Sequence, residues 1–282
     1  MTLQLSEVTL ICVDTRNTDV AIDSMSYSLI QAKFAKNILF TSKNLCSKKI
    51  INKANMLNIN LVFIPEIKSI TEYSYFILTK LDDYISTNFC LVTQWDSWII
   101  DSAFWDKDFL NYDYIGAIWP HYSFNQIGNG GFSLRSKKLL KASKELITSS
   151  TKFHNPLIED DYICREKRDV FEKDYQIRFP TNTIANKFSI ERNGIPSQSF
   201  GFHGMFHFNF FFKKDDDLIK VINKLSEDCF MGSSSYDLIK SLLAEKRFNS
   251  AKLIIKRRLK HSGLSTKNIK LYYFLLIEKI LK

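Results

Sequence analysis

The chain has little of the residues that mark several classes of protein. Its 282 residues include only 9 glycines, 5 prolines and 5 cysteines, which excludes collagen-like and disulfide-framework proteins, and no heptad pattern is sustained as in a coiled coil. The cysteines form no C-x-x-C pair, so a zinc ribbon is not supported either. No apolar run approaches the roughly 18 residues of a membrane span. Hydrophobic residues still make up 45% of the chain, which is typical of a folded globular protein.

Cysteine usage and the N-terminus indicate the compartment. Cys12, Cys90 and Cys164 lie in apolar runs, where a thiol acts as a small hydrophobe. Scattered cysteines in odd number favour a reducing compartment. The N-terminus lacks a basic stretch followed by an apolar core, so no secretory signal is expected. We therefore expect a cytoplasmic protein.

The net charge of +9 is concentrated at one end of the chain. The segment from Glu245 to Lys282 holds eleven basic and two acidic residues, which accounts for the whole excess. A basic helical tail is typical of docking to anionic lipid or to a partner. Nucleic-acid binding through the tail and a merely solvated helical face are the alternatives.

The first half of the chain alternates two hydrophobic patterns. Continuous apolar runs predict buried strands, and apolar residues on successive turns predict helices. We expect these elements, in order, at 8–13, 20–34, 37–41, 48–57, 60–64, 71–85 and 88–93. The alternation predicts an α/β fold with a mixed, mostly parallel sheet flanked by helices.

The second half has a different organisation. We expect strands over 114–119 and 132–135, helices over 137–148 and 160–171, loops over 181–204 and an edge strand over 206–212. From Asp215 onward the pattern is helical, and Tyr236 to Leu259 predicts two amphipathic helices joined near Arg247. We place the boundary near Lys213, between a domain of 1–212 and a small helical C-terminal region of 213–282.

Two acidic residues follow predicted strands. Asp14 ends the first strand, and Asp96 follows the strand at 88–93. Ligands of open α/β sheets bind beyond the carboxyl ends of the strands, and a carboxylate there suits a divalent cation. The alternative for Asp14 is a cap on the following turn. The alternative for Asp96 is a cap on a helix starting near Ser97.

Two further motifs carry chemistry-bearing residues. Gly128-Asn-Gly-Gly131 allows a ligand to approach the backbone closely, although a simple hairpin turn is the alternative. In Glu159-Asp-Asp161 one carboxylate is a candidate base, although a solvated helix start explains three adjacent acids as well. His203 and His207 are four residues apart, a spacing compatible with metal binding, but most such histidines are simply hydrogen-bonded.

These motifs occur in an order that resembles an uncharacterised bacterial family of GT-A-type glycosyltransferases found in surface-polysaccharide gene clusters. The residues that carry the resemblance are DTR (14–16), LVTQWDSWII (91–100), YDYIGAIWP (112–120), GNGGFSLRS (128–136), IEDDYIC (158–164) and SFGFHG (199–204). The match covers roughly 8–212 and leaves the basic tail out.

The resemblance implies a Rossmann-like GT-A fold with a nucleotide-sugar donor bound across the carboxyl edge of the sheet. The donor-binding residues that it implies are Asp14, Thr15, Arg16, Gln94, Trp95, Asp96, Asn129, Gly130, Gly131 and Arg135. It also implies a divalent cation, Mn²⁺ or Mg²⁺, held by Asp96 and His203. Gln94 stands where the family pattern has a first acid, so such a cation would lose one ligand.

The resemblance further implies an inverting transfer to a glycan or lipid-linked acceptor. The pair Glu159-Asp160 matches the family's catalytic acids, with Asp160 as the base. Peripheral contact with the inner face of the plasma membrane through 245–282 and oligomerisation through the C-terminal helices are part of this expectation. A non-catalytic member, a nucleotidyltransferase and a glycosidase with paired acids are the alternatives.

Overall fold

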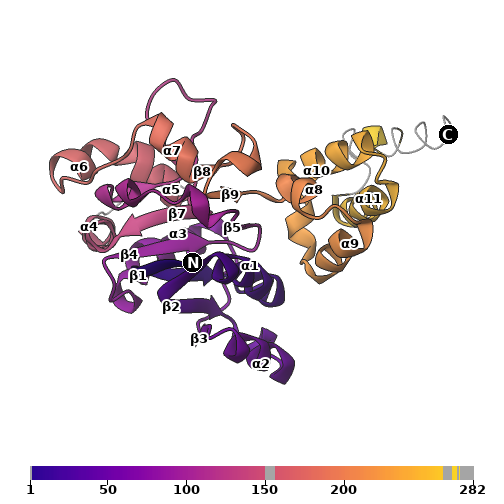
Figure 1. The fold of residues 1–282 in the computed structure, drawn as a ribbon, viewed down its shortest axis with the longest axis horizontal. Coiled ribbons are helices and arrows are strands. Elements are labelled where there is room, and N and C mark those ends of the chain that lie inside the picture. The colour runs from indigo at the N-terminus through magenta and orange to yellow at the C-terminus, as the bar shows by residue number, and fades with distance from the viewer. Residues whose placement is uncertain (1, 150–155, 263–268, 272, 274–282) are drawn as a thin grey trace. The chain divides into compact units, whose positions relative to one another are not determined.

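The computed structural model describes residues 2–149, 156–262, 269–271 and 273 (Figure 1). The chain forms two compact units, Met1–His203 and Gly204–Lys282. The sequence places the boundary of the catalytic domain near Lys213, slightly beyond the point where the two units divide. The extent of that domain as a functional unit stays a prediction.

The N-terminal unit is built on a six-stranded sheet in the order β3-β2-β1-β4-β7-β6. Its strands are β1 (Leu3–Val13), β2 (Ala32–Thr41), β3 (Asn60–Phe63), β4 (Phe89–Thr93), β6 (Tyr114–Ile115) and β7 (Phe132–Ser136). Strand β1 pairs in parallel with β2 and β4, β2 pairs in parallel with β3, and β7 is antiparallel to both β4 and β6. The predicted mixed, mostly parallel α/β sheet is confirmed.

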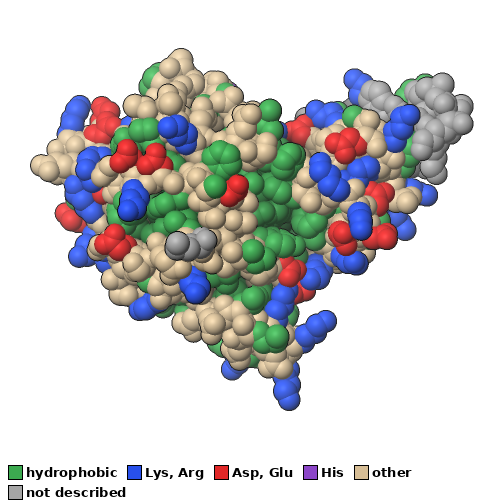
Figure 2. All heavy atoms as spheres, in the orientation of Figure 1, with side chains coloured by type: hydrophobic (Ala, Val, Ile, Leu, Met, Phe, Trp, Pro, Cys, Tyr) green, Lys and Arg blue, Asp and Glu red, His purple; other side chains and the backbone are tan. Residues whose placement is uncertain are grey.

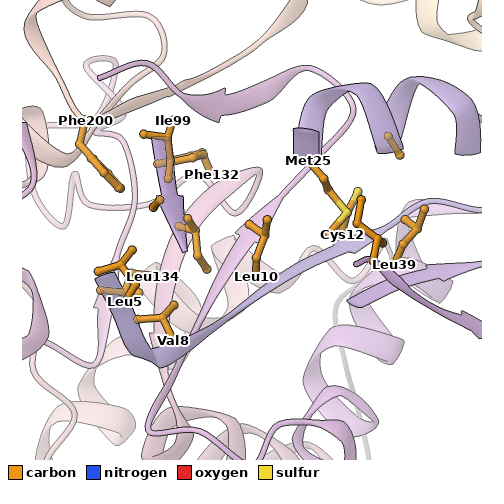
Figure 3. Close-up of a cluster of buried hydrophobic side chains, with 14 of the residues drawn as sticks. Leu5, Val8, Leu10, Cys12, Met25, Leu39, Ile99, Phe132, Leu134 and Phe200 are labelled. Atoms are coloured by element: carbon orange, nitrogen blue, oxygen red, sulfur yellow. The ribbon is translucent and has the colours of Figure 1, made fainter. Parts of the chain in front are cut away.

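Helices cover both faces of this sheet. Successive residues of a strand point to opposite faces, so each face has apolar side chains of its own to bury. On one face, Leu10 and Cys12 of β1 pack with Met25 of α1 (Thr18–Gln31) and with Ala54 of α2 (Lys48–Met56); Figure 3 shows part of this cluster. On the other face, Ile11 and its neighbours pack against α3 (Ile70–Thr79) and α4 (Lys137–Ser149). Both faces of the strands are therefore buried, which explains their continuous apolar runs.

The expectation of loops over 181–204 is wrong. This segment contains α7 (Asn182–Phe188), β8 (Ser189–Ile190) and β9 (Gly201–His203), and β8 and β9 form a small second sheet with β5 (Ser97–Ile99). Phe188 and Phe200 are fully buried against Phe109 and Phe132. Long-range aromatic packing fixes these short elements, and a local pattern does not report it.

Several other predicted elements differ from the structure. The helix expected over 71–85 ends at Thr79, and the strand expected over 114–119 ends at Ile115. The helix expected over 20–34 ends at Gln31, because Ala32 pairs with Leu3 and begins β2. The edge strand expected over 206–212 is wrong, since Met205–His207 is a 3₁₀ turn and Phe208–Phe211 is a helical turn, α8. The helix expected over 160–171 runs from α5 (Glu159–Asp161) through a π-helical turn (Tyr162–Glu166) into α6 (Arg168–Lys173).

The C-terminal unit is helical. Its longer helices are α9 (Asp215–Lys224), α10 (Ser233–Ala244) and α11 (Phe248–Ser262). The predicted pair of helices joined near Arg247 is confirmed. Buried apolar residues such as Leu238 and Ile254 form the interior of this unit.

Three arginines of the basic tail are used inside the C-terminal unit. Arg247 donates to Asp215 Oδ1 at 2.9 Å and to Asn209 Oδ1 at 2.8 Å. Arg257 pairs with Glu227 at 2.9 Å, and Arg258 donates to the Gly232 carbonyl at 2.9 Å. The tail's formal charge therefore overstates the charge that it offers to a partner.

Basic and acidic side chains are interspersed on the visible face of the C-terminal unit (Figure 2). None of the helices in the described part of the chain combines the length and the apolar character that crossing a membrane requires.

Candidate functional site

The carboxyl ends of β1 and β4 meet at the point where the strand order changes direction. The chain proceeds from β1 to β2 and β3 on one side, whereas β4 lies on the other side of β1. Asp14 follows β1, and Asp96 follows β4. The pKa of the Cys12 thiol lies well above its usual range because of burial and because of these two nearby carboxylates. The structure thus brings Asp14 and Asp96 to the edge where open α/β sheets bind ligands.

Asp14 caps the turn that follows β1, which is the alternative role that the sequence suggests for it. Its Oδ1 accepts hydrogen bonds from the backbone N–H groups of Arg16 at 2.7 Å and Asn17 at 2.5 Å. Thr15 is buried and its hydroxyl accepts from Ile67 N at 2.9 Å, which ties the β3–α3 connection to the first strand. The side chain of Arg16 is exposed at this edge. A role of these three residues in donor binding stays a prediction.

Asp96 lies in a tight turn and does not cap a helix, because Ser97 begins strand β5. The hydroxyl of Ser97 accepts from Gln94 N at 2.8 Å and donates to the Gly131 carbonyl at 2.7 Å. This one side chain joins the Gln94–Asp96 turn to the glycine-rich loop. Trp95 is half-buried, whereas Trp98 is a core residue packed edge-on against Phe202.

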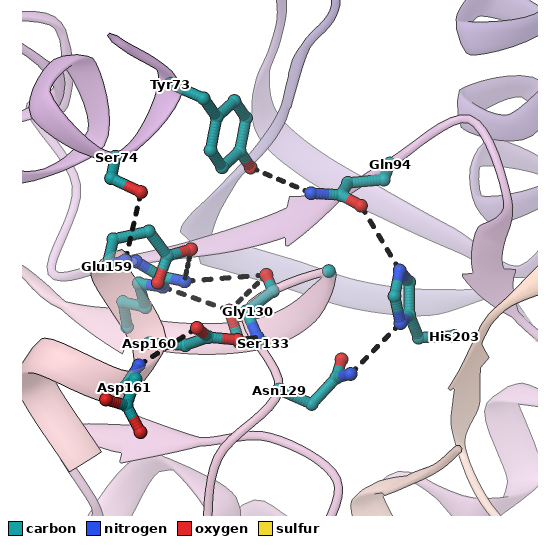
Figure 4. Close-up of polar contacts among 12 residues, drawn as sticks. Tyr73, Ser74, Gln94, Asn129, Gly130, Ser133, Glu159, Asp160, Asp161 and His203 are labelled. Atoms are coloured by element: carbon teal, nitrogen blue, oxygen red, sulfur yellow. Dashed lines mark hydrogen bonds and ion pairs between the residues drawn. The ribbon is translucent and has the colours of Figure 1, made fainter. Parts of the chain in front are cut away.

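His203 lies between Gln94 and Asn129, which contact its two ring nitrogens (Figure 4). Its Nε2 lies 3.2 Å from Gln94 Oε1 and 3.5 Å from Asp96 Oδ1. Its Nδ1 lies 3.0 Å from Asn129 Nδ2 and 3.5 Å from Glu191 Oε1. His203 therefore connects the turn after β4, the glycine-rich loop and the segment after β8. His207, in contrast, belongs to the C-terminal unit.

The carboxylates around His203 favour its protonated form. Burial by itself would lower the pKa of His203, but Asp96 and Glu191 raise it to about 9. The charged imidazole in turn holds the pKa of Glu191 below its usual value against the effect of burial. Sequence reasoning missed Glu191, because only the pairing of β8 with β9 places it beside His203.

The donor set around His203 Nε2 fits a divalent cation in part. Asp96 supplies a carboxylate, His203 an imidazole nitrogen and Gln94 an amide oxygen, all of them ligand types found at Mn²⁺ and Mg²⁺ sites. Among the described residues no group of three or more His, Cys, Asp and Glu could hold a metal ion. A cation here would therefore depend on Gln94 as the third protein ligand.

The glycine-rich loop before β7 needs its glycines because other groups occupy the space of a side chain. A Cβ at Gly131 would lie 2.2 Å from the His203 ring, and a Cβ at Gly130 would lie 2.2 Å from Glu159 Oε1. Asn129, between β6 and this pair, has a left-handed backbone with φ 54°. Its Oδ1 is buried and has no hydrogen-bond partner among the described residues. The motif is therefore part of the site and more than a hairpin turn.

A buried ion pair supports the loop from beneath. Arg135 has no exposed surface, and its Nη2 lies 2.9 Å from Glu159 Oε1. Its Nε donates to Ser133 Oγ at 3.0 Å, and Ser133 donates to the Gly130 carbonyl at 3.0 Å. Arg135 thus acts on the site through the loop. Burial raises the pKa of Glu159 to about 7, although Arg135 opposes this shift.

Asp160 is the more open of the two neighbouring acids. It is half-buried, whereas Glu159 is 3% exposed. Its Oδ2 accepts from Gly130 N at 2.7 Å, and its Oδ1 accepts from Asp161 N at 2.9 Å. Burial raises its pKa above the usual value, against these two hydrogen bonds. The two acids therefore lie in different environments, as a division of roles requires.

Helix α3 contributes two residues that sequence reasoning missed. The hydroxyl of Tyr73 accepts from Gln94 Nε2 at 3.1 Å, which orients the Gln94 oxygen toward His203. Ser74 Oγ accepts from Glu159 N at 3.0 Å and anchors the start of α5. Both residues lie inside a helical pattern, so no local signal separates them from ordinary helix residues.

A protein-family model matches residues 58–203, which hold most of this site. The model describes a protein of unknown function, DUF5672. The chain belongs to the DUF5672 family. The match supports the family resemblance drawn from the motifs, whereas the GT-A assignment and the polysaccharide gene clusters stay predictions. No curated protein matches the sequence of this chain.

Several solved structures resemble part of the chain at low identity. The apo form of the glycosyltransferase GlyE of Streptococcus pneumoniae TIGR4 has a TM-score of 0.42 and 13% identity, over 64% of this chain and 46% of GlyE. This chain thus spans less than half of GlyE. A glycosyltransferase involved in glycosylation of the major capsid of PBCV-1 has a TM-score of 0.44 and 12% identity, over 70% of this chain and 91% of that one. An active-site mutant of LgtC has a TM-score of 0.41 and 14% identity, over 77% of this chain and 96% of LgtC.

Replacing Gly131 by alanine is expected to move the His203 ring. The added methyl would lie 2.2 Å from the ring, so the imidazole cannot keep its present position between Asp96 and Glu191. We expect the pKa of His203 to fall from about 9 toward its ordinary value, measured by NMR titration of the five histidines. Gly232→Ala is the control, because its Cβ meets no atom closer than 4.0 Å. An unchanged His203 titration in Gly131→Ala would contradict this packing.

The pH dependence of stability reports the protonation state of Glu159. An unfolded glutamate releases its proton near pH 4.5, whereas folded Glu159 retains it up to about pH 7. The folded state thus binds more protons in this window, and stability falls as pH rises through it. We expect the free energy of unfolding of the wild type, relative to Glu159→Gln, to decrease between these pH values in chemical denaturation. A relative stability that rises with pH would show that Arg135 keeps the carboxylate ionised.

Proposed function

We propose that the N-terminal unit is a glycosyltransferase of GT-A type that uses a nucleotide-sugar donor. The observation that carries the proposal is the convergence of Asp96, His203 and Asp160 on one glycine-rich loop, at the carboxyl edge of a mostly parallel sheet. A site of this kind supplies polar groups for a diphosphate and a separate carboxylate for a base. The family resemblance supports the same reaction class.

The donor is proposed to lie across the ends of β1 and β4. Its nucleoside would lie beside the Asp14–Arg16 turn, where Arg16 is exposed, and its diphosphate beside Asp96 and His203. The sugar is proposed to lie beside the backbone at Asn129–Gly131. Trp95, half-buried on the same turn as Asp96, offers an aromatic face to the donor.

A divalent cation at this place would be held by Asp96, His203 and Gln94. When bound, it would stabilise the negative charge that the diphosphate gains as it leaves. Binding requires His203 to give up its proton, since only the neutral imidazole is a ligand.

Asp160 is proposed as the general base of an inverting transfer. The acceptor hydroxyl gives its proton to the Asp160 carboxylate as its oxygen bonds to the anomeric carbon, and the bond from that carbon to the diphosphate oxygen breaks. The hydrogen bond from Gly130 N fixes the carboxylate beside the loop. Glu159 and Arg135 are proposed to position this arrangement from beneath, since both are buried.

Donor binding and turnover can be separated with two variants. We expect a nucleotide sugar, tested with and without Mn²⁺, to raise the melting temperature of the wild type and of Asp160→Asn, but not of Asp96→Ala. Asp160→Asn should lose turnover by roughly 10²–10⁴-fold, the usual contribution of a general base. Asp174→Asn is the control for both measurements, because Asp174 is an exposed acid that follows α6 and is not among the residues of the site.

Three outcomes would count against this proposal. They are no stabilisation by any nucleotide sugar, full turnover in Asp160→Asn, and a product that retains the anomeric configuration of the donor. Release of pyrophosphate or of free sugar, in place of a nucleoside diphosphate, would favour a nucleotidyltransferase or a glycosidase.

We propose anionic lipid as a contact of the C-terminal unit, in keeping with a lipid-linked acceptor in surface-polysaccharide synthesis. Lys252, Lys256 and Lys260 of α11 are exposed at four-residue spacing, so they share one side of the helix. Sedimentation with phosphatidylglycerol vesicles at low salt should be lost when all three become glutamine. Equal sedimentation of this variant would contradict the proposal.

A further inference from the structure

The loop between β6 and β7 carries an unusual share of aromatic rings. Residues 119–126 read Trp-Pro-His-Tyr-Ser-Phe-Asn-Gln. Phe124 is 67% exposed, His121 is exposed and Tyr122 is half-buried. Exposed aromatic residues grouped in one loop point to a binding surface, whereas single ones do not.

This loop is held in a defined conformation by its own hydrogen bonds. Its stem closes through the pairing of Ile118 with Ile127. Above the stem, Trp119 N donates to the Gln126 carbonyl at 2.7 Å, and Gln126 Nε2 donates to the Tyr122 carbonyl at 2.6 Å. The aromatic rings are therefore presented on an ordered support.

Arg165 fastens the loop to the helix that carries Asp160. Its guanidinium lies 3.5 Å from the centre of the Tyr122 ring, and its Nη1 donates to the Phe124 carbonyl at 3.0 Å. Arg165 belongs to the π-helical turn that follows α5, and its Nε lies 3.7 Å from Asp161. One face of Tyr122 is thus covered, and the centre of the His121 ring lies 4.2 Å from that of the Tyr122 ring. The same guanidinium lies 5.3 Å from the centre of the Phe124 ring. The loop is thereby joined to the residues next to the proposed base.

Trp119 fastens the other side of the loop to the glycine-rich motif. A Cβ at Gly128 would lie 2.3 Å from the Trp119 ring, so the indole packs directly on this backbone. Gly128 immediately precedes Asn129 and Gly130, which contact His203 and Asp160. The aromatic loop therefore adjoins both parts of the proposed catalytic site.

The chemistry of the loop selects its ligand. Residues 119–126 contain no lysine, arginine, aspartate or glutamate, and Arg165 is used in holding the loop. A phosphate or an anionic lipid surface would need free positive charge here. Flat rings beside neutral hydrogen-bonding groups, such as Ser123 and Asn125, instead match a sugar ring, which has an apolar C–H face and hydroxyls at its edge.

We infer that the His121, Tyr122 and Phe124 surface is the acceptor subsite and stacks against a sugar ring of a glycan acceptor. This inference rests on the proposed transferase function. It adds the acceptor class, a carbohydrate in place of a protein or a lipid alone, and it names the residues that bind it. The loop is joined through Arg165 to Asp161 and through Trp119 to the glycine-rich motif that binds Asp160, where an acceptor hydroxyl must be deprotonated.

The test uses neutral disaccharides and three variants of the full chain. Saturation-transfer NMR with lactose, cellobiose, maltose and N,N′-diacetylchitobiose should show binding of at least one to the wild type. Phe124→Leu keeps an apolar side chain but removes the flat ring, and should weaken that binding roughly three- to tenfold, the value of one aromatic contact. Phe124→Trp should retain it. Phe63→Leu, at an exposed position of β3, is the matched control and should also retain it.

The melting temperature with the nucleotide sugar separates the two proposals. All three variants should keep the donor's stabilising effect, since neither Phe124 nor Phe63 is among the residues proposed to bind the donor. Binding of no disaccharide, or equal binding by Phe124→Leu and the wild type, would overturn the acceptor subsite. If the nucleotide sugar does not raise the melting temperature of the wild type while a disaccharide still binds, the donor proposal alone is overturned.

Discussion

The buried ion pair of Arg135 and Glu159 is the interaction on which the site depends. It joins strand β7 to helix α5 below the glycine-rich loop, and both side chains are almost completely shielded from water. Removing the acid of such a pair typically costs about 3–5 kcal/mol, because the charge of the arginine stays buried without its partner. The loop above it can approach so closely only because Gly130 has no side chain. The pair therefore fixes the position of the glycine-rich loop relative to α5 and, with it, the position of Asp160.

The polar groups of the site form two linked sets with different electrostatic characters. Around Glu159 burial dominates and favours a neutral acid. Around His203 several carboxylates dominate and favour a positive ring. The glycine-rich loop separates them, since Gly130 contacts one set and Gly131 the other. One short segment thus lies between an acid that burial keeps neutral and a ring that neighbouring carboxylates keep positive.

The sequence predicts the architecture and most of the site, and it fails where long-range packing decides. Apolar runs such as 8–13 and 88–93 identify buried strands because both faces of the sheet are covered. Asp96, Gly130 and His203 are found because their motifs are local. Glu191, Tyr73 and Arg165 are not found, since only the fold places them against the motif residues. The short elements between Thr181 and Gly204 were missed for the same reason, as their stability comes from aromatic packing around Phe188 and Phe200.

The π-helical turn after α5 sets the angular phase of α6 relative to α5. Lys167 N bonds to the Tyr162 carbonyl, five residues back, so one residue more than in an α-helix occupies the turn. Each residue of an α-helix advances the side-chain direction by roughly 100°. Deleting one residue within Tyr162–Glu166 would restore α-helical phase and rotate α6 by that amount, without altering Glu159–Asp161. The direction in which the side chains of α6 point, relative to Asp160, therefore depends on a single residue of helix length.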